Sequence, residues 1–130
     1  TIFMGDTLGL IYPHGDFVQP NLPPPDFNKD TLFKTLDNIY SLDLKQLAIA
    51  HFGLHTNPYE LIENAYQSIN DWIKFIENLP NTSNEDAADL LKNWVITNYE
   101  ILNIDQETIK NYIDNASFLM QVVGIRNYIN

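Results

Sequence analysis

The sequence has no cysteine, so it contains neither a disulfide framework nor a thiolate metal site. Basic residues are also scarce, because seven lysines and arginines stand against seventeen acidic residues, a formal net charge of −10. Such a surface repels phosphate backbones and anionic lipid, so we expect neither nucleic acid nor membrane as a partner. No apolar run has membrane-spanning length, and no secretory leader is visible. A chain without cysteine fits a reducing compartment, and the expected location is cytoplasmic.

What is present is a globular composition, with 45% hydrophobic residues in a chain of 130. Such a chain can bury roughly two-thirds of the surface that it exposes when unfolded. An apolar run, Ile2 to Met4, follows Thr1 at once and is typical of a buried strand. A core strand at the very start indicates that the chain is a fragment of a longer parent. The alternative is an intact protein that has been processed.

The first part of the chain has an α/β pattern. A buried strand over residues 1–6 precedes a long loop, residues 7–27, that holds five of the seven prolines. An amphipathic helix over 29–42 leads to a second buried strand over 46–50. A strand–helix–strand unit of this kind usually has parallel neighbouring strands.

The remainder of the chain is predicted to be helical. Asn57, Pro58 and Glu60 are typical of a helix start. Three amphipathic helices follow, over 58–79, 85–102 and 105–123, with Gly124 ending or bending the last one. We therefore expect an α/β part over 1–80 and an appended helical hairpin over 81–130.

Two residues at the ends of the predicted strands could carry chemistry. Asp6 follows the first buried strand and His51 follows the second. If the strands are parallel neighbours, both residues leave the same edge of the sheet, where ligands bind in α/β proteins. Alone, Asp6 fits an ordinary strand-ending aspartate that starts a turn, and His51 fits a core histidine hydrogen-bonded to the backbone. The pair together indicates a metal or acid–base site.

The motifs around these residues resemble those of the metallo-β-lactamase-fold metallohydrolase superfamily. Residues 3–9, FMGDTLG, resemble its Gly-Asp strand end, and residues 49–53, IAHFG, resemble its last metal-binding strand end. The resemblance implies the C-terminal half of an αββα metallo-β-lactamase sandwich with an appended helical hairpin. It implies that Asp6 bridges two divalent metal ions, zinc or iron, and that His51 binds one of them. Thr7 and Gly53 would lie near the pocket.

The chain departs from that family in one large respect, because the upstream His-x-His-x-Asp-His motif is absent. It has three histidines, and no two of them are spaced His-x-His. A catalytic zinc site needs at least three protein ligands, and Asp6 and His51 supply only two. We therefore expect this chain alone to be inactive and a missing N-terminal half to supply further His and Asp ligands.

The expected function of the parent is hydrolysis of a small ester, thioester or lactone-like substrate by a metal-activated water at a binuclear site. His14, Phe17 and His55 are candidate pocket residues, and the proline-rich loop is expected to shape the entrance. Oxidoreduction at an iron centre is a second chemistry for the same ligands. The alternative function is a non-catalytic helical module for interaction or dimerisation. The helical hairpin could roof a pocket or join two copies, so a homo-oligomer is also possible.

Overall fold

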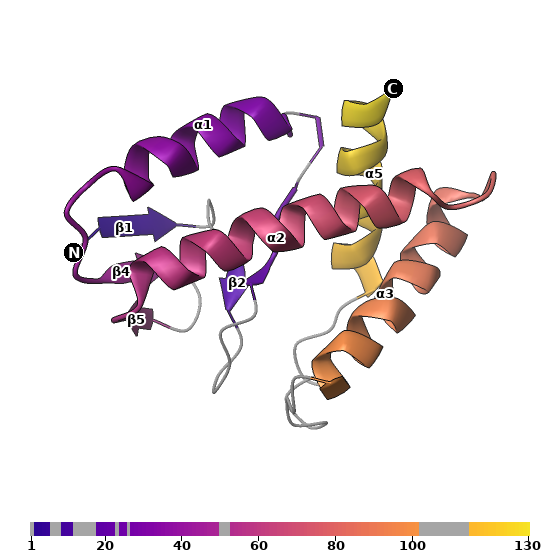
Figure 1. Ribbon diagram of the computed structural model, residues 1–130. Helices are drawn as coiled ribbons and strands as arrows, with labels where there is room; N and C mark the ends of the chain where they lie inside the picture. The colour runs from indigo at the N-terminus through magenta and orange to yellow at the C-terminus, as the bar shows by residue number, and fades with distance from the viewer. Residues whose placement is uncertain are drawn as a thin grey trace. The chain divides into compact units, whose positions relative to one another are not determined.

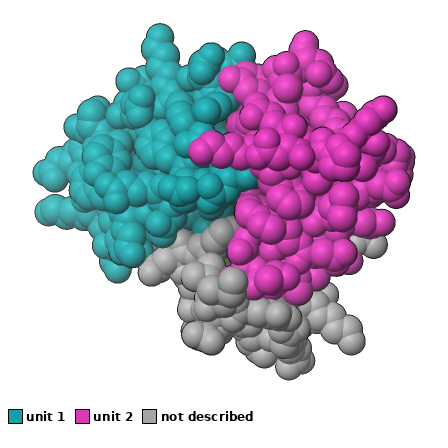
Figure 2. All heavy atoms as spheres, turned by 45° about the vertical axis from the view of Figure 1, so that its right-hand side comes forward, with its two compact units in different colours: residues 1–21, 28–71 teal, residues 22–27, 72–130 magenta. Residues whose placement is uncertain are grey.

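The computed structural model describes residues 2–5, 9–11, 18–22, 24–25, 27–49, 53–101 and 115–130 (Figure 1). The chain divides into two compact units, and each is described here by itself (Figure 2). Unit 1 comprises residues 1–21 and 28–71, and unit 2 comprises residues 22–27 and 72–130.

Unit 1 contains a sheet of three short strands, β1 (Ile2–Gly5), β4 (Leu47–Ile49) and β5 (Gly53–His55), in the order β1-β4-β5. β1 and β4 are parallel, and β5 runs antiparallel to β4. The helix α1 (Lys29–Tyr40) lies between β1 and β4 in the chain. The predicted pairing of two parallel strands joined through a helix is confirmed, whereas β5 is absent from the sequence-based prediction.

A second, two-stranded ladder lies within the proline-rich stretch 7–27. It pairs β2 (Leu10–Ile11) antiparallel with β3 (Val18–Gln19). Gly9 precedes β2 with φ at 113°, and a Cβ there would collide with the carbonyl oxygen of Gln19, so only glycine fits. The prediction of an irregular loop over the whole stretch is wrong for these strands, because none of its prolines falls inside either of them.

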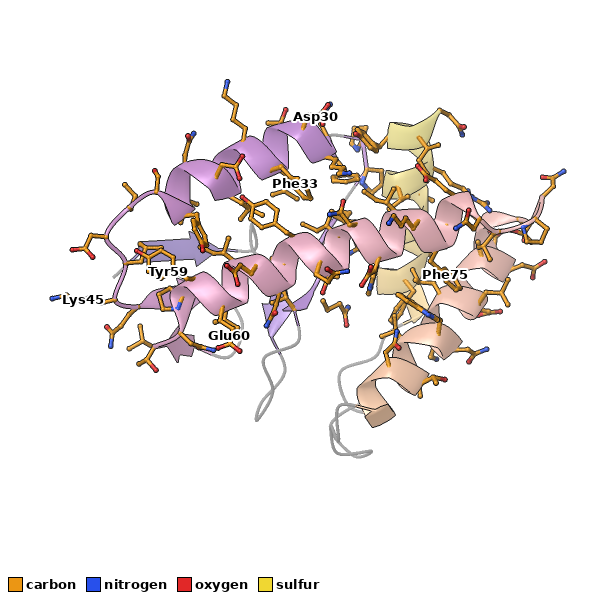
Figure 3. All side chains as sticks on the ribbon, viewed as in Figure 1. Asp30, Phe33, Lys45, Tyr59, Glu60 and Phe75 are labelled. Atoms are coloured by element: carbon orange, nitrogen blue, oxygen red, sulfur yellow. The ribbon has the colours of Figure 1, made fainter. Side chains whose placement is uncertain are left out.

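Side chains of α1 meet side chains of the first half of α2 (Pro58–Glu77) in unit 1. Each helix presents an aromatic, an acidic and a second aromatic residue at positions i, i+4 and i+7, the spacing of one helix face. The six residues form what we term the aromatic–carboxylate zipper: Phe33, Asp37 and Tyr40 from α1, and Tyr59, Glu63 and Tyr66 from α2. The rings of Phe33 and Tyr66 meet edge to face with centroids 4.7 Å apart, and those of Tyr40 and Tyr59 with centroids 5.1 Å apart. Figure 3 labels one residue of each pair, Phe33 on α1 and Tyr59 on α2.

Local hydrogen bonds set the ends of α1. The side-chain oxygen of Asn28 accepts the backbone N–H of Thr31 at 3.0 Å and caps the helix start. The hydroxyl of Tyr59 accepts the N–H of Leu44 at 2.9 Å and donates to the carbonyl oxygen of Leu42 at 2.5 Å. Tyr59 thereby holds the loop that leads from α1 into β4. This loop starts two residues before the predicted end of the helix at Leu42.

Unit 2 is built from the end of α2 with α3 (Asn84–Ile101) and α5 (Asn115–Ile129). The rings of Trp72 and Phe118 stack with centroids 5.7 Å apart, and those of Phe75 and Trp94 with centroids 4.8 Å apart. These rings lie with a set of buried aliphatic side chains: Leu22, Ile73, Ile76, Ala87, Leu91, Val95, Val122 and Ile125. The core of this unit is therefore apolar and contributed mainly by helices.

Two polar side chains of α5 tie other segments of unit 2 to that helix. The guanidinium of Arg126 donates to the carbonyl oxygen and the hydroxyl of Thr82, both at 2.9 Å, and to the side-chain oxygen of Asn84 at 2.8 Å. The backbone N–H of Leu22 donates to the side-chain oxygen of Gln121, which is buried. These bonds hold the start of α3 and Leu22 within the unit.

The long C-terminal helices agree with the sequence-based prediction except at their ends. α2 and α3 lie within two residues of their predicted bounds. α5 runs through Gly124 to Ile129, so the glycine does not end the helix. Gly124 is buried between the fully buried Val122 and Ile125, and this packing outweighs the low helix propensity of glycine. The predicted start of the third helix near Asp105 lies outside the described residues.

The predicted fold class, an α/β C-terminal half of an αββα metallo-β-lactamase sandwich with an appended hairpin, is wrong. The described residues lie mostly in four long helices, and their strands have at most four residues each. Most of the buried apolar side chains among them also belong to helices. Short apolar runs predict that a strand exists, but they do not predict how many strands join it or how long the sheet becomes. The described part of the chain is predominantly helical.

Candidate metal site at the sheet edge

The two strands that precede the predicted metal ligands end at one edge of the sheet. Ile2 lies opposite Leu47, and Gly5 lies opposite Ile49. Because β1 and β4 are parallel, their carboxyl ends share an edge, the usual place for ligands in α/β sheets. Asp6 follows Gly5 directly in the sequence, and His51 stands two residues after Ile49. The register thus brings together the residues that lead into both predicted ligands.

Most predicted site residues lie outside the described part of the chain. Asp6 and His51, the predicted metal ligands, are among them, as are Thr7 and the predicted pocket residues of the proline-rich loop, His14 and Phe17. The meeting of their side chains therefore stays a prediction. A carboxylate and an imidazole are donors that suit zinc and iron, so their chemistry fits such a site.

The backbone of β5 places the two remaining candidates at different ends of the sheet. Gly53 lies opposite Ile49, beside the candidate edge, whereas His55 lies opposite Leu47. They are two positions apart along an extended strand, a distance of about 7 Å. The backbone of Gly53 therefore lies at the candidate edge, and that of His55 lies at the other end of β5. A pocket role for His55 stays a prediction.

A bulge interrupts the pairing of β1 immediately before the candidate edge. Phe3 lies opposite Ala48, and Gly5 lies opposite the next residue, Ile49. Met4 is therefore the extra residue of the bulge, with no residue of β4 opposite it. A bulge of this kind changes the direction in which the following side chains leave the strand, and bulges often stand beside active sites. No feature of the sequence other than the neighbouring Gly5 signals it.

The described residues alone do not assemble a metal site. Among them, no group of three or more His, Asp or Glu side chains is placed to hold a metal ion. The two predicted ligands fall outside this set, and two ligands are fewer than the three that a catalytic zinc site needs. The described residues therefore assemble no metal centre, and the two predicted ligands would supply only part of one.

Two tyrosine–carboxylate hydrogen bonds of the zipper were missed in the sequence, although the i, i+4, i+7 spacing in both helices could have indicated them. The hydroxyl of Tyr40 donates to Glu63 at 2.8 Å, and that of Tyr66 donates to Asp37. Burial and the bond to Asp37 raise the pKa of Tyr66, and the bond to Glu63 raises the pKa of Tyr40. Both phenols stay protonated at neutral pH, so they act as hydrogen-bond donors between helices and not as bases.

Comparison of the chain with protein-family models, with curated proteins and with solved structures finds no match. The resemblance to the metallo-β-lactamase superfamily stays a prediction that depends on the two short strand-end motifs. A separate finding concerns membranes: no helix in the described ranges has both the length and the apolar character needed to cross a bilayer.

Proposed function

We propose that this chain supplies part of the binuclear metal site of a metal-dependent hydrolase for small ester, thioester or lactone-like substrates. The observation that supports the proposal is the parallel pairing of β1 and β4, with Gly5 opposite Ile49 at the edge that leads to Asp6 and His51. In this proposal the carboxylate of Asp6 and the imidazole of His51 would help to hold the two metal ions.

When bound, two divalent ions, zinc or iron, supply a metal-activated water as the nucleophile and polarise the carbonyl oxygen of the substrate. Asp6 and His51 hold these ions only in part, because a catalytic site needs more protein ligands than two. The remaining His and Asp ligands come from an N-terminal half of a longer parent. The proposed compartment is the cytoplasm, since a chain without cysteine fits reducing conditions.

The test compares two Asp→Asn variants of the full-length parent. Asp6→Asn removes the proposed metal-binding carboxylate, and Asp43→Asn removes an exposed carboxylate in the loop before β4. Loss of a residue that supports a metal ligand already costs 10- to 100-fold, so we expect Asp6→Asn to lower esterase activity by about 100-fold or more. Its bound metal, measured by plasma mass spectrometry, should fall by about one equivalent.

The control and the isolated chain make this test decisive. Asp43→Asn should keep both the metal and the activity of the unmodified parent. The isolated 130-residue chain should bind zinc weakly and below one equivalent. Full metal content in Asp6→Asn, or tight stoichiometric binding by the isolated chain, would contradict the proposed division of ligands.

A non-catalytic helical module is the second candidate, and exposed apolar side chains in unit 2 favour it. Leu90 on α3 is 42% exposed and Met120 on α5 is 49% exposed. Intact mass of the natural protein under denaturing conditions separates the candidates. A species well above 15.0 kDa supports the longer hydrolase, whereas a single species at 15.0 kDa favours the module.

A further inference from the structure

β5 is the outermost strand of its sheet and has one free edge among the described residues. One of its sides pairs with β4, and no described strand pairs with the other. Leu54, in the middle of β5, is 55% exposed, the largest value among the exposed large apolar side chains of the described residues. An edge strand with unpaired backbone groups and an exposed leucine is a template for pairing with another strand.

The charge pattern indicates which kind of chain can approach this edge. Residues 44–59 contain no aspartate or glutamate, although the chain has seventeen, and Lys45 is their only charged side chain at neutral pH. Two copies that each carry a net charge of −10 repel one another over most of their surfaces. Segment 44–59, which includes β5, therefore brings no carboxylate of its own to a contact between two copies, and the next acidic residue is the exposed Glu60 in the first turn of α2.

We propose that β5 pairs antiparallel with β5 of a second copy about a two-fold axis. Leu54 is the central residue of a three-residue strand, so in this arrangement it meets Leu54 of the second copy, and Gly53 lies opposite His55 of the second copy. The two sheets then form one sheet of six strands. The contact uses the same edge on both copies, so it closes at a dimer and does not propagate into a fibre.

The length of β5 sets the strength of this dimer. Three residues per strand bury much less than the roughly 1,200 Å² that stable interfaces need. We therefore expect reversible self-association with a Kd on the order of 10 to 500 µM. Higher salt should strengthen it, because salt screens the repulsion between the two acidic chains.

Sedimentation velocity on the 130-residue chain between about 5 µM and about 1 mM tests the proposal over that range of Kd. The unmodified chain should shift from a 15.0 kDa monomer toward twice that mass as concentration rises. Leu54→Lys places like charges opposite one another at the two-fold axis and should leave a monomer throughout, with an unchanged thermal midpoint. Leu90→Lys is the matched control, because it makes the same change at an exposed leucine of α3 and should still dimerise.

Three outcomes overturn the proposal: a monomeric unmodified chain over the whole range, a Leu54→Lys variant that dimerises normally, or an equal loss in Leu90→Lys. Loss of the dimer with increasing salt also counts against it, because that dependence indicates ion pairs and not an acid-free edge. These results are independent of the metal content of the longer parent.

Discussion

The two compact units are held by different kinds of side-chain contact. In unit 1, α1 and α2 meet through the aromatic–carboxylate zipper, whose tyrosine hydroxyls donate to Asp37 and Glu63. In unit 2, the helices bury stacked rings such as Trp72 on Phe118, and the hydrogen bonds of Arg126 tie a loop to that core. The stability of unit 1 should therefore respond to changes of protonation, and that of unit 2 to changes of packing volume.

The largest expected effect is a cavity in unit 2. Phe118 is 1% exposed and stacks on Trp72, so Phe118→Ala should lower the free energy of unfolding by about 3–5 kcal/mol. Urea denaturation followed by tryptophan fluorescence measures the loss. Met120→Ala on the same helix is the control, because Met120 is 49% exposed and its truncation should change stability by no more than about 0.5 kcal/mol. Equal losses in the two variants would show that unit 2 is not held by packing.

A smaller loss is expected when the main polar contact of unit 2 is removed. Arg126→Met keeps the aliphatic stem but removes three charge-assisted hydrogen bonds to Thr82 and Asn84. The free energy of unfolding should fall by about 2 kcal/mol in the same urea titration. Lys74→Met, at an exposed position of α2, removes a positive charge without a described hydrogen bond and should be nearly neutral. A fully stable Arg126→Met variant would show that the three hydrogen bonds of Arg126 do not stabilise unit 2.

The smallest loss in the free energy of unfolding at neutral pH is expected from a substitution in the zipper of unit 1. The zipper should also make the stability of the unmodified chain fall at high pH. Tyr66→Phe should cost about 1–2 kcal/mol at pH 7, because the donor to Asp37 is lost. The pKa of Tyr66 is raised above its ordinary value of 10.0 in the folded chain, so above pH 10 the unfolded chain loses a proton that the folded chain keeps. The stabilisation is therefore complete below pH 10 and declines as pH rises further.

Urea titrations between pH 8 and pH 11 measure this dependence. The unmodified chain should lose stability above about pH 10, and Tyr66→Phe should lose less over the same interval. Phe118→Ala should keep the slope of the unmodified chain, because its defect lies in unit 2. Identical slopes in the unmodified chain and Tyr66→Phe would mean that the zipper does not carry the response to base.

The parts of the fold that could be predicted have local signals in the sequence. The apolar run before Gly5 predicts a strand, and the structure has β1 there. Asn57 and Pro58 predict a helix start, and α2 begins at Pro58. β5 could not be predicted, because Gly53 to His55 is too short for a periodic pattern. For the zipper, the i, i+4, i+7 spacing could have indicated one aromatic and acidic face on each helix, but the spacing within α1 does not reveal that its partner is α2.

The candidate site was predictable only to the level of the strand ends. The sequence indicates that Asp6 and His51 follow two buried strands, and the parallel register of β1 and β4 agrees with that arrangement. The direction in which a side chain leaves a strand changes with a slip of one residue, and the bulge at Met4 is such a slip. No local pattern specifies it, because a bulge forms only when a particular partner strand is in place.

Gly9 places a restriction on how sequences related to this one can vary. Its φ of 113° disfavours every residue with a side chain, and a Cβ would also collide with the carbonyl oxygen of Gln19. The second obstacle is a backbone atom, so no change of the side chain at position 19 can relieve it. A substitution at position 19 therefore cannot compensate for a substitution of Gly9. In a saturation mutagenesis library selected for folding, we expect position 9 to retain glycine and position 19 to accept several residues.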